Sequence, residues 1–324
     1  MKLTIATCQF PISVDIKKNY DYIVKQVKEA KRKNAHVVHF PETCLSGYAG
    51  TDFASYDDYD WDTLLHYAKK VLDLTKEQDV WIVLGSTHKL SNSNKPHNSL
   101  YILNNKGKII DRYDKRFCSG DAQSNTGDLA HYTPGNHFVV FEINGIKCGT
   151  LVCHEYRYPE LYREYKKREV QLIFHSYHTG NINKQRFKEM QDYVGGELRN
   201  FNNGSNLPEI TMPAAMHMAA ANNYMWISCP TSCAKQSCWS SFFVRPDGVI
   251  TGKLKKNITG VLISEIDTET EYYDSTIAWR KRAMEGIFHS GMIVEDERSD
   301  TRTEFRIPLK QEEGHFILAC NARR

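Results

Sequence analysis

A cysteine at a strand-to-helix corner is the first residue of this chain whose position favours chemistry. An apolar run that begins near Ile146 ends at Cys153, and Pro159 then opens a helical pattern over 160–168, because proline suits a first helical turn. Such a corner exposes a side chain at the carboxyl edge of a sheet, where helix N–H groups favour negative charge on sulfur. Cys153 is therefore a candidate nucleophile, although most free cysteines are simply small buried hydrophobes.

Two more reactive side chains lie directly after predicted strands. Glu42 follows a short strand over 37–40, and Lys115 follows a strand over 109–113. In α/β proteins the carboxyl edge of a sheet is where sites are built. Together with Cys153, these residues supply a nucleophile, a base and a cation for an oxyanion, which acyl transfer from a carbon–nitrogen bond requires.

The elements that must position these residues alternate between strands and helices. Strands are predicted over 3–9, 37–40, 80–85, 170–174, 224–229 and 261–266, and hairpins over 99–113, 138–153 and 240–252. Helices are predicted over 16–30, 64–72, 160–168, 184–193 and 212–222, the first capped by Asp15. This alternation indicates an α/β fold with a covered sheet. The segment 181–213 is polar and irregular, which favours an excursion from the fold.

Composition excludes several classes of protein. The 324 residues are 41% hydrophobic and 25% charged with a net charge of +3, which is ordinary for a globular protein and too mild to indicate a nucleic-acid partner. Nine cysteines form an odd, dispersed set, unlike a secreted disulfide scaffold. The first residues are too polar for a signal peptide, and no stretch approaches the ~20 apolar residues of a membrane span. We therefore expect a reduced, cytoplasmic protein without a membrane partner.

Four blocks of the sequence, in order along the chain, resemble the successive signatures of the nitrilase superfamily, the carbon-nitrogen hydrolases. They are Phe40-Pro41-Glu42-Thr43-Cys44-Leu45-Ser46-Gly47-Tyr48, Tyr113-Asp114-Lys115, Thr133-Pro134-Gly135 and Cys153-His154-Glu155-Tyr156-Arg157-Tyr158-Pro159-Glu160-Leu161, and Pro246-Asp247-Gly248 matches a later one. The resemblance implies an α/β fold, a four-layer α-β-β-α sandwich, that forms homodimers or larger homo-oligomers. It also implies that no metal and no cofactor takes part. We expect a hydrolase domain over 1–267 and a C-terminal arm over 268–324 that packs on the body or on an oligomer partner.

The same resemblance implies roles for the three reactive residues. Cys153 would be the nucleophile, Glu42 the general base and Lys115 the oxyanion-stabilising cation. The substrate would be a small molecule with an amide or carbamoyl group, and the bond broken would be a carbon–nitrogen bond other than a peptide bond. The alternative is a non-catalytic member of the same fold that binds a small molecule or acts as a scaffold.

Several positions depart from the pattern of that family. Asp128 stands where the family usually has a second active-site glutamate; it is expected to hydrogen-bond Lys115, or else to cap a turn in its loop. Glu155 stands where many members carry aspartate. Asn222 and Asn223 lie where relatives often show a Glu-Asn pair, which predicts an unusual pocket together with the segment 181–213. The changes at Asp128 and Asn222 motivate the non-catalytic alternative.

Four side chains are candidates for contact with the substrate: Tyr48, His154, Tyr177 and His178. Tyr48 follows the block that contains Glu42, and His154 follows Cys153 as a wall of the pocket. Tyr177 and His178 lie just past the strand over 170–174. For the tyrosines and His178 the competing interpretation is ordinary aromatic packing.

Other reactive residues are set aside. Three cysteines and two histidines could suggest zinc, but their spacing lacks a Cys-x-x-Cys pair and fits a structural site poorly; they are Cys229, Cys233, Cys238, His175 and His178. Cys44 and Cys118 are interpreted as residues that line the site. A papain-like protease would need a local signature around Cys153 that this sequence lacks.

Overall fold

The computed structural model describes residues 1–91, 93–300, 302–303, 305–308 and 317–320 of the chain. The contacts divide the chain into two compact units, Met1–Ala278 and Trp279–Arg324. The first unit therefore ends at Ala278, beyond the boundary expected after Asp267. That an arm over 268–324 packs on the body or on a partner stays a prediction.

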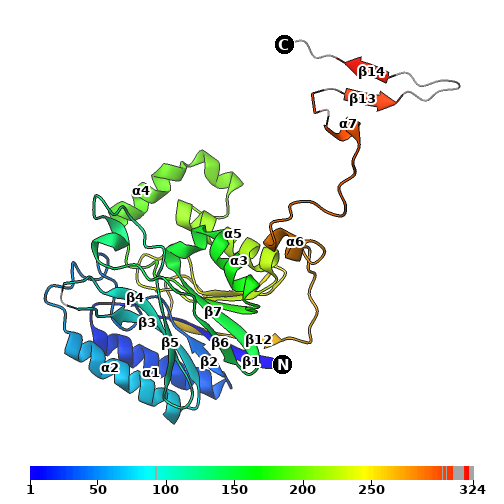
Figure 1. Ribbon diagram of the computed structural model, residues 1–324. Helices are drawn as coiled ribbons and strands as arrows, with labels where there is room; N and C mark the ends of the chain where they lie inside the picture. The colour runs from blue at the N-terminus through cyan, green and yellow to red at the C-terminus, as the bar shows by residue number, and fades with distance from the viewer. Residues whose placement is uncertain (92, 301, 304, 309–316, 321–324) are drawn as a thin grey trace. The chain divides into compact units, whose positions relative to one another are not determined.

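The first unit contains two six-stranded sheets (Figure 1). The first has the order β12-β1-β2-β3-β4-β5, with bounds Gly260–Asp267, Lys2–Gln9, Val37–His39, Trp81–His88, His97–Leu103 and Ile109–Asp114. The second has the order β11-β10-β9-β8-β7-β6, with bounds Ile250–Lys253, Phe242–Val244, Trp226–Cys229, Leu172–Ser176, Ile146–Val152 and Val140–Ile143. The predicted strands and hairpins are thus present, with their ends moved by a few residues.

Both sheets have the same internal pattern. Strands β1, β2 and β3 run parallel, and so do β7, β8 and β9, while the outer strands of each sheet pair antiparallel. Parallel strands place their carboxyl ends at one edge. The residues that follow β2, β7 and β8 therefore lie at the carboxyl edges of parallel strands.

Helices pack against the sheets to give four layers. Helices α1 (Ile16–Arg32) and α2 (Trp61–Glu77) lie beside the first sheet, and α3 (Pro159–Lys167) and α5 (Leu207–Asn223) lie beside the second (Figure 1). Neighbouring residues of one strand point to opposite faces: Val37 of β2 joins the core between the sheets, whereas Val38 joins the core under α1 and α2. The expected α-β-β-α sandwich is confirmed.

A buried polar cluster joins the two sheets just below the residues that follow β2. The Nδ1 and Nε2 atoms of His39 each lie 2.8 Å from a serine hydroxyl, those of Ser228 and Ser176. Burial holds the pKa of His39 well below its usual value, so the ring is neutral and each hydroxyl has a partner. This cluster fixes the end of β2 against β8 and β9.

Local signals in the sequence explain the ends of several elements. The side chain of Asp15 caps α1 by accepting a hydrogen bond from the N–H of Lys18 at 3.0 Å, as predicted. Asn144 and Gly145 both have positive φ, 51° and 80°, which is the conformation of the tight hairpin turn that the Asn-Gly pair favours. Pro159 is the first residue of α3.

Helix α5 begins earlier than predicted. Its first residue is Leu207, and the side chain of Asn206 caps it by accepting from the N–H of Glu209 at 3.0 Å. Pro213 lies inside the helix, although proline removes one helical hydrogen bond and usually marks a boundary. The excursion before it contains α4 (Lys184–Val194) and a 3₁₀ helix, η3 (Glu197–Phe201), and no residue of either is buried.

The described residues of the second unit form two short helices and a pair of strands. Helices α6 (Arg280–Met284) and α7 (Glu297–Asp300) precede β13 (Phe305–Pro308) and β14 (Ile317–Cys320), which pair antiparallel. Among the described residues, no helix combines the length and the apolar character that crossing a bilayer requires.

Candidate active site

Glu42 lies in the tight loop that follows β2. The N–H of Glu42 donates to the carbonyl oxygen of Tyr177 at 3.2 Å, which joins this loop to the segment after β8. The loop also runs directly over Gly85 of β3, where a Cβ atom would lie 2.0 Å from the carbonyl oxygen of Pro41. Only glycine permits this approach, so the end of β3 helps to place the carboxylate.

The carboxylate of Glu42 is fully buried, and one of its two oxygens accepts hydrogen bonds. Its Oε1 accepts from Lys115 Nζ at 2.9 Å and from Asn98 Nδ2 at 2.7 Å. Its Oε2 is buried without a hydrogen-bond partner among the described residues. A buried carboxylate oxygen without a partner is costly, and here it is free to exchange a proton with another group.

Lys115 follows β5 and is held from both sides of its backbone. Its N–H donates to the carbonyl oxygen of Asn98 at 2.9 Å, and its carbonyl oxygen accepts from Gly135 at 2.8 Å. Its buried ammonium lies 2.8 Å from Asp128 Oδ2 as well as 2.9 Å from Glu42. Burial alone would lower the pKa of Lys115, but these two carboxylates outweigh it and raise the pKa. Lys115 is therefore a permanent cation at neutral pH.

Asp128 makes the expected contact with Lys115. It lies in a 3₁₀ helix, η1 (Gly127–Ala130), and its carboxylate also accepts from the N–H of Ser119 and from the hydroxyl of Tyr48. Burial opposes ionisation of Asp128, but the charge of Lys115 and these hydrogen bonds lower its pKa below the usual value. One methylene shorter than glutamate, Asp128 still reaches the ammonium.

Cys153 opens a 3₁₀ helix, η2 (Cys153–Arg157), directly after β7. Its φ is +43°, a left-handed conformation that is uncommon for residues other than glycine and that marks functional corners. Cys153 as a whole residue is intermediate in exposure. Burial and the nearby Glu42 raise its pKa, while Lys115 and a hydrogen bond from the backbone N–H of His178 lower it. The thiol thus lies within electrostatic reach of both Glu42 and Lys115.

Glu155 joins the Lys115 loop to the Cys153 corner. Its Oε1 accepts from the hydroxyl of Tyr113 at 2.8 Å and from the N–H of Arg116 at 2.7 Å, and its Oε2 accepts from the N–H of Val152 at 2.7 Å. Burial raises the pKa of Glu155 in spite of these donors. The side chain is fully buried, so its role is to hold two loops together.

Tyr48 and His178, two of the substrate candidates, stack on each other beside the ion cluster. Their ring centroids are 5.2 Å apart at an interplanar angle of 26°, and Lys115 Nζ lies 5.9 Å from the centroid of Tyr48. The ring of His154 is half-buried and makes an edge contact with Tyr158. Tyr48 and His178 therefore lie beside the ion cluster, whereas His154 is placed near it by its position directly after Cys153.

Tyr177 does not take the expected place in the pocket wall. Its ring is fully buried, stacks on His175 with centroids 4.3 Å apart and meets the edge of Trp239. Its hydroxyl donates to the sulfur of Met216 at 3.1 Å. Tyr177 thus points into the core in this structure, and its contact with a substrate stays a prediction.

No motif in the sequence indicates two residues that contact the candidate site residues. Asn98 donates to Glu42, and Asp52 forms an ion pair with His178 at 3.0 Å. Neither belongs to a block that resembles the family, and each meets its partner only in the fold. For Asn98 the sequence gives one indirect hint. It lies in a largely apolar strand, β4, and a polar side chain that is buried usually has a polar partner.

The cysteines near Glu42 and Lys115, and the possible zinc site, were given no catalytic role in the sequence analysis. Cys44 is buried and its thiol donates to the carbonyl oxygen of Gly85 at 3.3 Å; burial raises the pKa of Cys118 to about 12. Within the part of the chain that is described, no three His, Cys, Asp or Glu side chains are arranged to hold a metal ion.

Comparison with known proteins gives one family and several relatives. The family model described as carbon-nitrogen hydrolase matches residues 4–273. The 2-oxoglutaramate amidase of Bacillus subtilis (strain 168) is 29% identical over 179 residues, which are 54% of this chain and 64% of that protein. An omega-amidase of Xenopus tropicalis is 25% identical over 184 residues, or 53% and 62% of the two chains. The chain thus spans less than two thirds of the length of these relatives.

Solved structures share the fold. A mutant amidase from Nesterenkonia sp. AN1, with the acetamide moiety of fluoroacetamide added covalently at its active-site cysteine, has a TM-score of 0.64 at 17% identity and covers 82% of this chain and 90% of its own. Another mutant of that amidase, in complex with butyramide, has a TM-score of 0.63 at 17% identity, with coverage of 82% and 90%. At this identity the likeness concerns the fold alone.

Proposed function

Because this chain belongs to the carbon-nitrogen hydrolase family, we propose that it hydrolyses an amide or carbamoyl group of a small molecule through a Cys153 acyl-enzyme. The main support is the meeting of three groups from distant parts of the chain. The buried Lys115–Glu42 ion pair, at 2.9 Å, lies within electrostatic reach of a thiol on a strained corner. The residues after β2, β5 and β7 thus supply a base, a cation and a nucleophile.

The first step activates the thiol. Burial and the carboxylate of Glu42 raise the pKa of Cys153, so the resting sulfur carries its proton. Glu42 Oε2, which has no hydrogen-bond partner among the described residues, accepts that proton as the sulfur attacks the carbonyl carbon. The base therefore acts only when a substrate is present.

The second step stabilises the oxyanion and releases the nitrogen. Lys115 is positive at neutral pH and is held by Asp128 and Glu42, so its charge faces the oxygen that becomes negative. The protonated Glu42 then gives its proton to the nitrogen, the carbon–nitrogen bond breaks, and ammonia or an amine leaves. Cys153 keeps the acyl group as a thioester.

The third step returns the free enzyme. Water attacks the thioester carbon while Glu42 accepts one of its protons, and Lys115 again stabilises the oxyanion. The carbon–sulfur bond breaks, the acid leaves, and the proton on Glu42 returns to the sulfur. One water is consumed for each amide, and no redox partner is needed.

Small terminal carboxamides are the first substrates to test. Two relatives are described as 2-oxoglutaramate amidase and omega-amidase, and a primary amide would release ammonia. Tyr48, His154 and His178 lie beside the reactive groups and are the side chains that we propose contact the rest of the substrate.

The test is ammonia release from a panel of small amides by the wild type and by Cys153→Ala. We expect Cys153→Ala to lose activity completely, while Cys148→Ala, which removes a buried thiol within β7, keeps it. Unchanged ammonia release by Cys153→Ala would show that the nucleophile is another group.

A non-catalytic scaffold is the alternative. It was motivated in part by Asp128, which stands in place of a glutamate. In the structure Asp128 Oδ2 lies 2.8 Å from Lys115 Nζ, so the ion pair with the cation is kept. If the wild type releases no ammonia from any amide and binds amides with Cys153 unmodified, this alternative is favoured.

A further inference from the structure

A neutral amide on β4 contacts the carboxylate of Glu42 and has no part in the steps above. Asn98 Nδ2 donates to Glu42 Oε1 at 2.7 Å, and both side chains are fully buried. The carboxylate fixes the orientation of the amide, because turning the amide over would place its oxygen against Oε1 and bring two acceptors together. Asn98 does not titrate, so it is a constant N–H donor to the proposed base.

The backbone of Asn98 is held on both sides. Its carbonyl oxygen accepts from the N–H of Lys115 at 2.9 Å, and on the other side of β4 Asn98 pairs with Thr87 of β3. Asn98 therefore contacts the cation through its backbone and the base through its side chain. A substitution that shortens the side chain keeps the backbone contacts, so it changes the support of the base alone.

Two donors meet on the same oxygen of Glu42. Oε1 accepts from Asn98 Nδ2 at 2.7 Å and from Lys115 Nζ at 2.9 Å, whereas Oε2 is buried without a hydrogen-bond partner among the described residues. A carboxylate oxygen has two lone-pair positions, and both positions of Oε1 are occupied. A proton that Glu42 takes up therefore has room only on Oε2.

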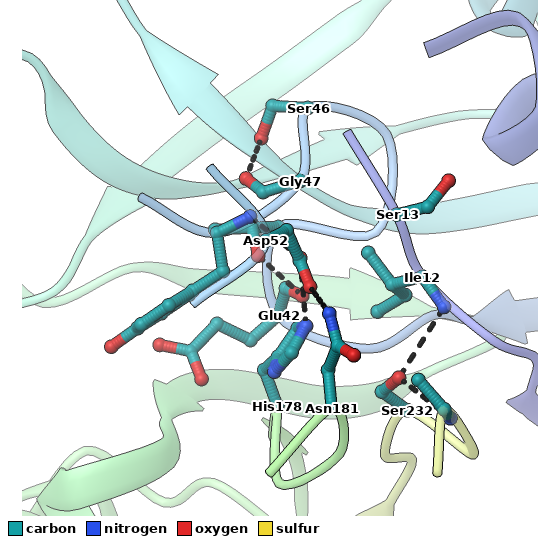
Figure 2. A network of polar contacts seen from close by, with 12 residues as sticks. Ile12, Ser13, Glu42, Ser46, Gly47, Asp52, His178, Asn181 and Ser232 are labelled. Atoms are coloured by element: carbon teal, nitrogen blue, oxygen red, sulfur yellow. Dashed lines mark hydrogen bonds and ion pairs between the residues drawn. The ribbon is translucent and has the colours of Figure 1, made fainter. Parts of the chain in front are cut away.

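Two polar side chains beside Glu42 bind a different carboxylate. His178 Nε2 and Asn181 Nδ2 lie 3.0 and 2.9 Å from the oxygens of Asp52 (Figure 2). They are thus engaged by Asp52. Among the described residues, the hydrogen bonds that orient the Glu42 carboxylate come from Asn98 and Lys115.

The amide of Asn98 is present although its oxygen is unpaired. Asn98 Oδ1 is buried without a hydrogen-bond partner among the described residues. An unpaired buried amide oxygen is unfavourable for stability, and an apolar side chain at this position would avoid it. This favours a role for the N–H half of the amide at Glu42 over a role in the stability of β4.

We propose that Asn98 positions the base: together with Lys115 its amide occupies Oε1 of Glu42, which makes Oε2 the oxygen that exchanges protons with Cys153 and with the leaving nitrogen. Asn98 is a positioning residue and neither takes up nor releases a proton. Without its amide, one lone pair of Oε1 is free, and the carboxylate can take up the proton on the wrong oxygen. The inference rests on the proposed function for the role of Glu42 as base.

The experiment is a double-mutant cycle on Asn98→Ala and Glu42→Gln. It measures the rate at which iodoacetamide alkylates Cys153 at neutral pH, by mass spectrometry of the Cys153 peptide. Glutamine keeps an acceptor for Asn98 and Lys115 and replaces Oε2 with an NH₂ group, which cannot take up the proton. We expect Glu42→Gln to slow alkylation about 100-fold and Asn98→Ala about tenfold. In the Glu42→Gln background, Asn98→Ala should slow it no further.

Ser99→Ala is the matched control. It removes a buried hydrogen bond from the same strand to another carboxylate, from Ser99 Oγ to Asp114 Oδ1 at 2.5 Å, and its alkylation rate should match the wild type. Ammonia release from a primary amide gives a second readout. Because Asn98 does not contact the substrate in this scheme, Asn98→Ala should lower kcat about tenfold and leave KM unchanged.

Equal effects of Asn98→Ala in the two backgrounds would overturn the proposal, because a merely structural residue acts whether or not the base is present. An unchanged alkylation rate in Asn98→Ala would overturn it as well. If Asn98→Ala does not fold, Asn98→Asp takes its place; it keeps the shape of the side chain but presents an acceptor to Glu42, so the same dependence on Glu42 is expected. Alkylation needs no amide turnover, so a wild type that releases no ammonia would refute the proposed function and leave this comparison intact.

Discussion

At the scale of single residues, Glu155 shows how a departure from the family pattern is accommodated. The longer side chain reaches donors on both the Lys115 loop and the Cys153 corner: the hydroxyl of Tyr113 and the N–H groups of Arg116, Phe117 and Val152. Glutamine in its place would keep one acceptor oxygen and turn an amide NH₂ toward N–H donors. The two loops would then lose their common anchor.

We therefore predict that Glu155→Gln lowers the free energy of unfolding by about 2–4 kcal/mol, because it leaves buried donors without partners. Urea denaturation followed by circular dichroism measures the loss. Glu160→Gln makes the same chemical change at an exposed position of α3, and it should stay within about 0.5 kcal/mol of the wild type. Equal stability of the two variants would show that Glu155 does not anchor the loops.

The reactive residues could be predicted from the sequence, whereas their partners could not. Glu42, Lys115 and Cys153 each follow a strand with a clear apolar pattern, and their blocks resemble a family. Asn98 and Asp52 are recognised only through contacts with Glu42 and His178, 56 and 126 residues away. Tyr177 was predicted from its place just past a strand, and no sequence pattern says which way a side chain points there; its ring packs on His175 in the core.

At the scale of elements, the glycine near the middle of β3 decides where the Glu42 loop lies. A Cβ at Gly85 would lie 2.0 Å from the carbonyl oxygen of Pro41 and 2.7 Å from the N–H nitrogen of Thr43. Both are backbone atoms, which cannot turn aside as a side chain can. The loop would have to rise from the sheet and carry the carboxylate of Glu42 with it.

Gly85→Ala is therefore predicted to destabilise the protein by about 1–3 kcal/mol and to slow amide hydrolysis further than this loss of stability explains. Thermal unfolding and ammonia release measure the two effects. Gly196→Ala is the matched control, because a Cβ there would meet nothing within 4 Å. Activity in Gly85→Ala equal to that of the control would mean that the position of the loop does not limit catalysis.

Periodicity predicted most elements, and cap chemistry explains where it failed. The helix over 16–30 was found from its apolar spacing and from Asp15, and it extends to Arg32. The start of α5 was missed because the residues before Met212 were included in the irregular segment 181–213. Asn206 and Pro208 carry the usual signals of a helix start, and these outweigh one proline inside the helix.

At the scale of the whole molecule, the alternation of elements and the resemblance together predicted the fold. Alternation alone indicates a covered sheet, and it does not say that the strands divide into two sheets of six. That division depends on the pairing of β1 with β12, between segments near the two ends of the first unit. Pairing at that distance leaves no local pattern.

Two properties of the whole molecule stay predictions. Assembly into a homodimer or a larger homo-oligomer follows from the resemblance, and light scattering on the full chain would measure it. A cytoplasmic location follows from the odd, dispersed cysteines. Cys153 and seven other cysteines are free thiols, so any of those seven can be compared with Cys153 in the same experiment.

The central claim is that catalysis passes through an acyl group on Cys153. The most direct measurement is the mass of the protein quenched in acid during turnover of a small amide, followed by peptide mapping. The account predicts an added mass equal to the acyl group on the peptide that contains Cys153, and no added mass in Cys153→Ala. Turnover without an adduct on Cys153, or with the adduct on another residue, would contradict it.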